Sequence, residues 1–81
     1  ALGRLHTLSG DYMAAIEVFH KVLAQDPYQE SAHRGLMDCY QRLGDRAAAI
    51  QQYRECAARL RDDLGLSPMP ETEALFRTIL G

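Results

Sequence analysis

The histidines and cysteines of this 81-residue chain are the side chains best suited to metal or nucleophilic chemistry. His6, His20 and His33 are widely separated, and neither Cys39 nor Cys56 stands at ligand spacing from a histidine. The chain also lacks the HExxH, CxxC, GxGxxG and Gly-Lys-Ser patterns of zinc, dinucleotide and phosphate sites. We therefore expect no metal and no cofactor. His20 is predicted at the surface, His33 at a helix interface, and both cysteines reduced in the core.

Two adjacent carboxylates, Asp62 and Asp63, are the remaining candidates for acid–base chemistry. Neighbouring positions of a helix point about 100° apart, so these two groups do not converge on one substrate. We expect a solvated pair at a helix end, and the chain is predicted not to be an enzyme.

The charge balance argues against direct contact with nucleic acid or membrane. The formal net charge is −2, and Arg54, Arg59 and Arg61 alternate with Glu55 and two aspartates, as on an ordinary solvated helix face. Contact with DNA is expected only through another domain of the parent protein. No apolar run approaches the roughly 20 residues that span a bilayer, and no signal peptide opens the chain, so a cytoplasmic location without membrane contact is predicted.

An internal repeat organises the elements that position these residues. Residues 10–16 (GDYMAAI) recur as residues 44–50 (GDRAAAI), an offset of 44 − 10 = 34. The aromatic residues Phe19 and Tyr53 are separated by the same offset. A self-similarity of this period is typical of helix–turn–helix repeat arrays. The fold class is therefore predicted to be all-α, built from antiparallel helix pairs.

Apolar periodicity predicts about five helices, over residues 1–8, 11–25, 27–43, 45–63 and 70–80. Ser9 and Gly10 are expected to end the first, and Asp11 to cap the second. Asp26 and Gln29 resemble a capping box for the third.

Glycine and proline mark the later boundaries. Gly44 is predicted to end the third helix and Gly65 the fourth, because glycine tolerates the left-handed conformation at helix ends. Two prolines, Pro68 and Pro70, make a stiff connector to the last helix.

The 34-residue period resembles the tetratricopeptide repeat, with small residues at Ala15 and Ala49 and a turn proline at Pro27. A narrower resemblance covers nearly the whole chain. Residues 26–37, 43–53, 60–68 and 70–76 are together similar to the bacterial transcriptional activator domain. In the Streptomyces antibiotic regulatory protein family, that domain follows a winged-helix DNA-binding domain.

The resemblance implies a non-enzymatic protein-interaction and regulatory module of a bacterial transcriptional activator. Its expected partners are the transcription machinery, its own DNA-binding domain, or a second copy of itself. The alternative is a general tetratricopeptide scaffold or peptide-binding module unrelated to transcription. Residues 1–81 are expected to form one domain, a fragment of a longer regulator, since the first residues resemble the interior of a helix.

A partner surface is expected on the concave wall that stacked helix pairs form with the first helix of each pair. Arg34 and Arg42 would bind an acidic peptide through charge-assisted hydrogen bonds, whereas Asp38 would repel a terminal carboxylate. Simple solvation of this helix face is an equal alternative. The outward positions are Arg4, Thr7, Leu8, Ser31, Arg34, Asp38, Gln41 and Arg42.

Self-association is a third use of the surface, through apolar faces left open at the two ends of the stack. These faces are expected to carry Leu2 and Leu5 at one end, and Leu75, Phe76, Ile79 and Leu80 at the other.

Overall fold

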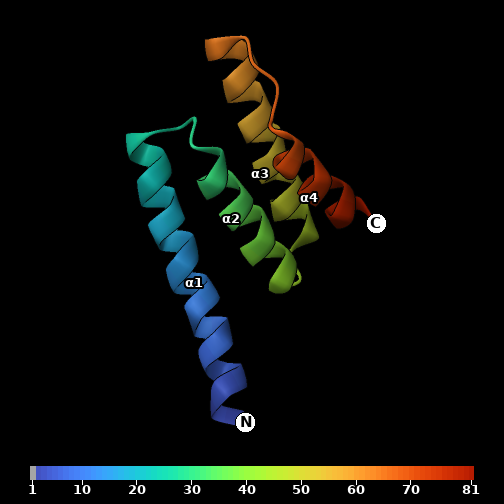
Figure 1. The fold of residues 1–81 in the computed structure, drawn as a ribbon. Helices are drawn as coiled ribbons and strands as arrows, with labels where there is room; N and C mark the ends of the chain where they lie inside the picture. Colours follow the sequence, from blue (N-terminus) through green and yellow to red (C-terminus); the bar gives the residue numbers. More distant parts are fainter. Residues whose placement is uncertain (1) are drawn as a thin grey trace.

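Four α-helices and one π-helical turn make up the computed structural model, which describes the backbone of residues 2–81 and the side chains of residues 11–81. In chain order they are α1 (Leu2–Gln25), α2 (Glu30–Arg42), α3 (Arg46–Arg59), η1 (Leu60–Leu64) and α4 (Pro70–Leu80). Helices α1, α2 and α3 run antiparallel in turn, and α4 packs against α2 and α3 (Figure 1). Residues 2–81 contain no strand, which confirms the predicted all-α class.

The first two predicted helices are one continuous helix, α1, of 24 residues. Ser9 and Gly10 do not end a helix, and Asp11 is not a cap. A helix-interior glycine costs only about 1 kcal/mol relative to alanine, and no proline is present to remove a hydrogen bond. Residues 2–81 therefore contain four α-helices rather than the predicted five or so.

The two copies of the repeat consequently differ in structure. Gly44 has a φ of 84°, and the hydrogen bonds from Gly44 N to Gln41 O (3.0 Å) and from Asp45 N to Tyr40 O (2.8 Å) close α2 in a Schellman motif. The Asp45 carboxylate then accepts a bond from Ala48 N at 3.1 Å and caps α3. The same letters at residues 10–11 lie inside α1, so the shared sequence encodes a turn only in the second copy.

The turn between α1 and α2 also differs from the prediction. Asp26 accepts a hydrogen bond from Tyr28 N at 3.1 Å, so its carboxylate stabilises the turn itself and does not cap the helix. Helix α2 begins three residues later than expected, at Glu30. Its N-cap residue, Gln29, makes no side-chain capping bond, and the predicted capping box is therefore wrong.

The C-terminal boundaries were predicted well. Gly65 has a φ of 68°, and Leu66 N donates to Leu60 O at 3.0 Å, which ends η1 as a glycine cap should. Pro70 occupies the first turn of α4, where a missing N–H costs nothing. What the periodicity did not predict is the widening of the last turn of the fourth predicted helix into the π-helical η1.

Two clusters form the core, one on each side of α2. Leu36 and Cys39 pack with Ile16 between α1 and α2, whereas Met37 packs with Ala49 and other residues among α2, α3 and α4. Tyr40 contacts both clusters, so α2 is the central helix. The half-buried apolar side chains around them are Tyr12, Ala15, Phe19, Leu23 and Leu43 on the first cluster, and Ile50, Tyr53, Leu75 and Phe76 on the second.

The apolar face of α4 is therefore not an open end of the stack. Ile79 is only 4% exposed, and Leu75 and Phe76 pack on the second cluster, leaving Leu80 as the exposed member of the predicted face. The side chains of Leu2 and Leu5, which were expected at the other end, lie outside the described residues. Leu64, the last residue of η1, is also exposed.

Candidate protein-interaction surfaces

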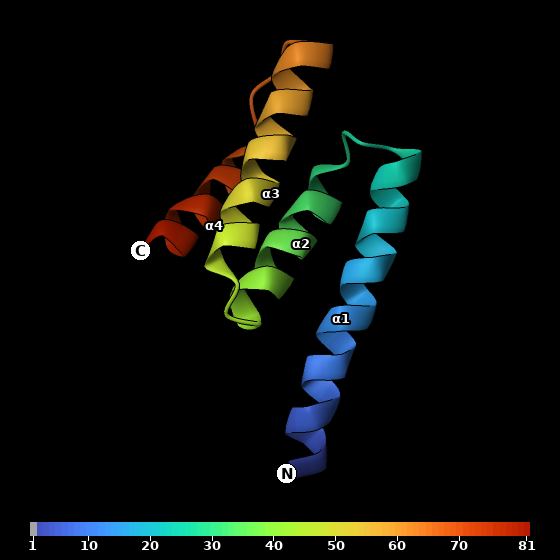
Figure 2. The same ribbon diagram turned by 180° about the vertical axis from the view of Figure 1, so that it is seen from behind.

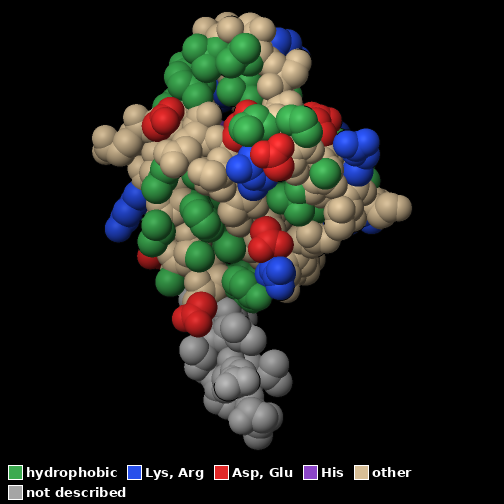
Figure 3. Space-filling view, in the orientation of Figure 1, with side chains coloured by type: hydrophobic (Ala, Val, Ile, Leu, Met, Phe, Trp, Pro, Cys, Tyr) green, Lys and Arg blue, Asp and Glu red, His purple; other side chains and the backbone are tan. Residues whose placement is uncertain are grey.

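The predicted partner surface lies on the side of α2 between α1 and α4, because Arg42 reaches Tyr12 of α1 and Arg34 reaches Thr72 of α4. We call Arg34, Asp38, Gln41 and Arg42 the α2 face. Acidic and basic side chains gather in the centre of this side, while hydrophobic side chains lie over α1 at the left (Figure 3). Asp38 and Arg42 form an exposed ion pair at 2.9 Å, and the Arg42 guanidinium lies 6.0 Å above the Tyr12 ring.

Arg34 makes its main contact inside the chain. Its guanidinium donates to Thr72 Oγ1 of α4 at 3.0 Å, across 38 positions of sequence. The same hydroxyl donates to Glu30 Oε1 at 2.8 Å, and Met69 N donates to that carboxylate oxygen at 2.8 Å. Thr72 is fully buried. These four residues form a polar clasp, named the Glu30 clasp, that joins the start of α4 to α2.

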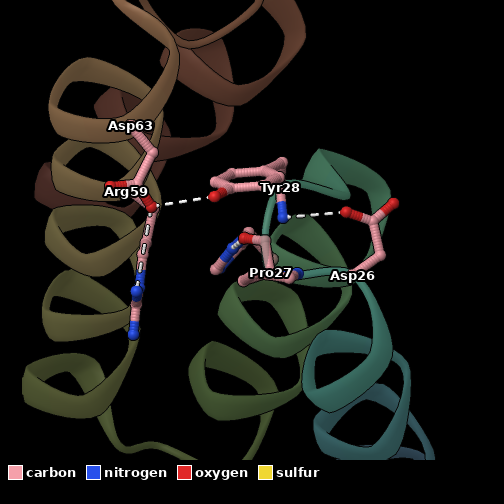
Figure 4. Close-up of polar contacts among 6 residues, drawn as sticks. Asp26, Pro27, Tyr28, Arg59 and Asp63 are labelled. Carbon is pink, nitrogen blue, oxygen red and sulfur yellow. Dashed lines mark hydrogen bonds and ion pairs between the residues drawn. The ribbon is translucent and has the colours of Figure 1, made fainter.

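The turn before α2 is tied to η1 by a second long-range contact. The Tyr28 hydroxyl donates to Asp63 Oδ2 at 2.9 Å, and Arg59 lies 3.8 Å from the same carboxylate (Figure 4). The hydrogen bond to Asp63 raises the pKa of Tyr28 above its ordinary value. Asp63 is thus a structural acceptor, and Asp62 pairs with Arg61 at 3.1 Å. The two adjacent aspartates have different partners, as their divergent directions on the helix predicted.

His33 is buried between α2, α3 and the turn, as predicted. A carbonyl oxygen only accepts, so the 2.9 Å contact with Pro27 O places the imidazole proton on Nε2. Nδ1 then accepts from the Gln52 amide at 2.9 Å. His33 and Gln52 are 3% and 5% exposed, and each stabilises the other in a position where an unpaired polar group would be costly. His20, in contrast, is exposed.

The cysteines are buried and free, as predicted. Burial raises the pKa of the Cys56 thiol to about 12, which keeps it protonated and unreactive near neutral pH. Among the described residues, no group of three or more His, Cys, Asp or Glu side chains is placed to hold a metal ion. None of the described helices has the length and apolar character needed to cross a membrane.

The model of the bacterial transcriptional activator domain family matches residues 1–80. The chain belongs to this family. It is also similar to the transcriptional regulatory protein MoaR1 of Mycobacterium tuberculosis and of Mycobacterium bovis, with 34% identity over 65 residues in each case. The aligned region is 80% of this chain and 21% of each relative, so the chain spans about a fifth of the length of these regulators. No solved structure matches it significantly.

The structure brings together part of the predicted site. Asp38 and Arg42 form a pair on the α2 face with half-buried Gln41 beside them, while Arg34 is turned toward α4. Arg4 and Thr7 lie in the first turns of α1, and their side chains are outside the described residues. Sequence reasoning missed Thr72. The available signal was its spacing of seven residues from Ile79, which places both on one face of α4.

Replacing Thr72 with valine is expected to lower the free energy of unfolding of the activator domain by about 1–3 kcal/mol. Valine keeps the shape of threonine but leaves Glu30 and Arg34 without their shared hydroxyl. Urea denaturation measures the loss. The matched control is Thr78→Val, whose hydroxyl contacts Ala74 O on the exposed side of α4 and which should stay within about 0.5 kcal/mol of wild type. Equal effects of the two substitutions would contradict a stabilising role of the clasp.

Stability is expected to fall as the pH rises from about 9 to about 12. Burial, and the hydrogen bond to Glu73, raise the pKa of Tyr53 from 10.0 to about 12, and burial raises that of Cys56 from 9.0 to about 12. Folding favours the neutral form of each group, because its pKa is higher in the folded chain than in the unfolded chain. This contribution to stability is complete at a pH below the unfolded-state pKa values and is lost as the pH rises through the folded-state values. Urea midpoints from pH 8 to 12 test this. Tyr53→Phe should show a shallower decline than wild type, and parallel curves would refute the assignment to Tyr53.

Proposed function

We propose that this activator domain is a non-enzymatic protein-contact module of a bacterial transcription regulator. The family match over residues 1–80 is the observation that supports it most directly. The two mycobacterial relatives named as transcriptional regulatory proteins are consistent with it. Under this proposal the domain works in the cytoplasm beside a separate DNA-binding domain, and it touches DNA only through that domain.

The contact surface in this proposal is the α2 face. The exposed Asp38–Arg42 pair presents both a carboxylate and a guanidinium, and a surface ion pair is worth at most about 1 kcal/mol, so a partner can replace it at little cost. Arg34 would contribute less than the sequence implied, because it already binds Thr72. The expected partner is a protein: the transcription machinery, the attached DNA-binding domain or a second copy.

The experiment compares Arg42→Glu with Arg54→Glu in a full-length regulator carrying the domain. Both arginines are exposed, but Arg54 lies on α3 and outside the α2 face. Arg42→Glu should reduce reporter transcription several-fold while DNA binding in a gel-shift assay and the melting temperature stay close to wild type. Arg54→Glu should leave transcription unchanged. Equal transcription from wild type and Arg42→Glu would reject the α2 face as the contact surface.

A further inference from the structure

Residues of α1, the turn before α2, α2 and α3 line a hollow of about 200 Å³ that shares no residue with the α2 face. Its lining residues come from α1, the turn, α2 and α3, and Figure 2 shows these elements in front of α4. Leu23 and Ala24 of α1, with Pro27 of the turn, give it an apolar wall, and the buried His33–Gln52 pair forms its floor. Because a hydrogen bond fixes those two side chains, the floor is preorganised for binding in the free protein.

The size of this hollow, named the α1–α3 hollow, restricts what fits in it. Sites for drug-sized molecules and cofactors enclose about 300–1,000 Å³, so about 200 Å³ is better matched to one long side chain of a protein. His20 lies at the α1 edge, where its Nε2 is 3.1 Å from the Tyr40 hydroxyl. The hollow is therefore bordered on that edge by a side chain held in place.

The opposite edge is formed by Glu55 and Arg59 of α3. A second hollow of about 300 Å³ adjoins it and shares both residues. Arg59 lies 3.8 Å from Asp63, and the other carboxylate of that second hollow, Asp62, pairs with Arg61. Among the described ion pairs, none includes Glu55. The edge shared by the two hollows thus carries one exposed carboxylate, Glu55, that is in none of these ion pairs, beside the Arg59 guanidinium that is paired with Asp63.

We propose that the α1–α3 hollow receives one arginine or lysine side chain of a partner protein. The aliphatic stem would lie along Leu23, Ala24 and Pro27, and the cationic head would reach Glu55 at the edge. Long basic side chains combine an apolar stem with a charged tip. The hollow complements both parts, since it has an apolar wall and a carboxylate at its edge. An acidic side chain would be repelled by Glu55, the one carboxylate in the lining of the hollow.

This inference rests on the proposed role in protein contact but uses a different surface. His33 in the floor and Asp38 of the α2 face are five positions apart, about 140° around the helix. The two surfaces are therefore separately accessible. Transcription by the Arg42→Glu variant tests the proposed function, whereas the binding measurement below tests the hollow alone.

The test uses the peptide acetyl-Gly-Leu-Arg-Leu-Gly-amide and a second peptide in which citrulline replaces arginine. Citrulline has nearly the shape of arginine without its charge. Titration into the 15N-labelled chain should shift the backbone amide signals of Ala24, Gln52 and Glu55. The citrulline peptide should bind about fivefold more weakly, the difference expected between a charge-assisted and a neutral hydrogen bond. Equal binding of both peptides, or shifts confined to the α2 face, would overturn the proposal.

Two variants and a control locate the binding. Glu55→Gln should weaken binding of the arginine peptide about fivefold and leave the affinity for the citrulline peptide unchanged. Ala24→Leu should weaken both peptides by filling the hollow, and Ala24 is exposed, so the fold should persist. Glu71→Gln removes an exposed carboxylate from α4, away from the hollow, and should change nothing. If Glu71→Gln weakened the arginine peptide as much as Glu55→Gln, the attraction would be one of general charge and the proposed site would be wrong.

Discussion

Leu36→Ala is expected to lower the free energy of unfolding by about 2–5 kcal/mol, the range for truncating a buried leucine. Leu36 is fully buried in the cluster with Ile16 and Cys39, at the interface that joins α1 to α2. Removing three carbons there loses their transfer free energy and leaves a cavity that two packed helices close only in part. Native domains are stable by about 5–15 kcal/mol, so this one change would remove a large share of the total.

Urea denaturation at 25 °C measures this effect as a lower midpoint with an unchanged slope. Leu66→Ala is the matched control, because Leu66 is 55% exposed in the connector before α4 and its truncation should change stability by about 0.5 kcal/mol or less. A loss below about 1 kcal/mol for Leu36→Ala would show that α1 is not held to α2 by this cluster. A changed slope would indicate instead that α1 unfolds separately from the rest.

The sequence predicted those parts of the fold that are encoded within a few residues. Gly44, Gly65 and Pro70 each fix a helix boundary through their own backbone chemistry, and the structure confirms all three. Gly10 failed because a glycine ends a helix only where the following chain turns back. At Gly44 the turn is completed by the Asp45 cap on Ala48, whereas residues 10–11 continue in α1.

The candidate surfaces were less predictable because their contacts join distant positions. Helical spacing predicted Arg34 at an outward position of α2, whereas its guanidinium binds Thr72, which lies 38 residues away in the sequence. Spacing along one helix gives the direction of a side chain and not the element that covers it. The α1–α3 hollow likewise forms because α1, the turn and α3 meet around His33. No pattern within a few residues of sequence predicts that these elements meet.

Gly35 shows the same limit, since a glycine inside a helical pattern indicates a packing constraint without naming the neighbour. A Cβ atom at Gly35 would lie 2.4 Å from Cζ of Phe19 and 2.5 and 2.7 Å from its two Cε atoms. Contacts below 3.0 Å require that something shifts. The Phe19 ring, half-buried between α1 and α2, occupies the space that a side chain at Gly35 would need.

Gly35→Leu is therefore expected to cost about 3 kcal/mol, the upper part of the range for overpacking, although leucine favours the helix more than glycine does. Gly35→Ala should cost less, because the gain in helix propensity of about 1 kcal/mol offsets part of the clash. The decisive measurement is a double-mutant cycle with Phe19→Ala by urea denaturation. Removing the ring makes room for the new side chain, so the double variant should be more stable than the sum of the single effects by about 0.5–3 kcal/mol. Strict additivity would mean that the clash with Phe19 is not what excludes a side chain at Gly35.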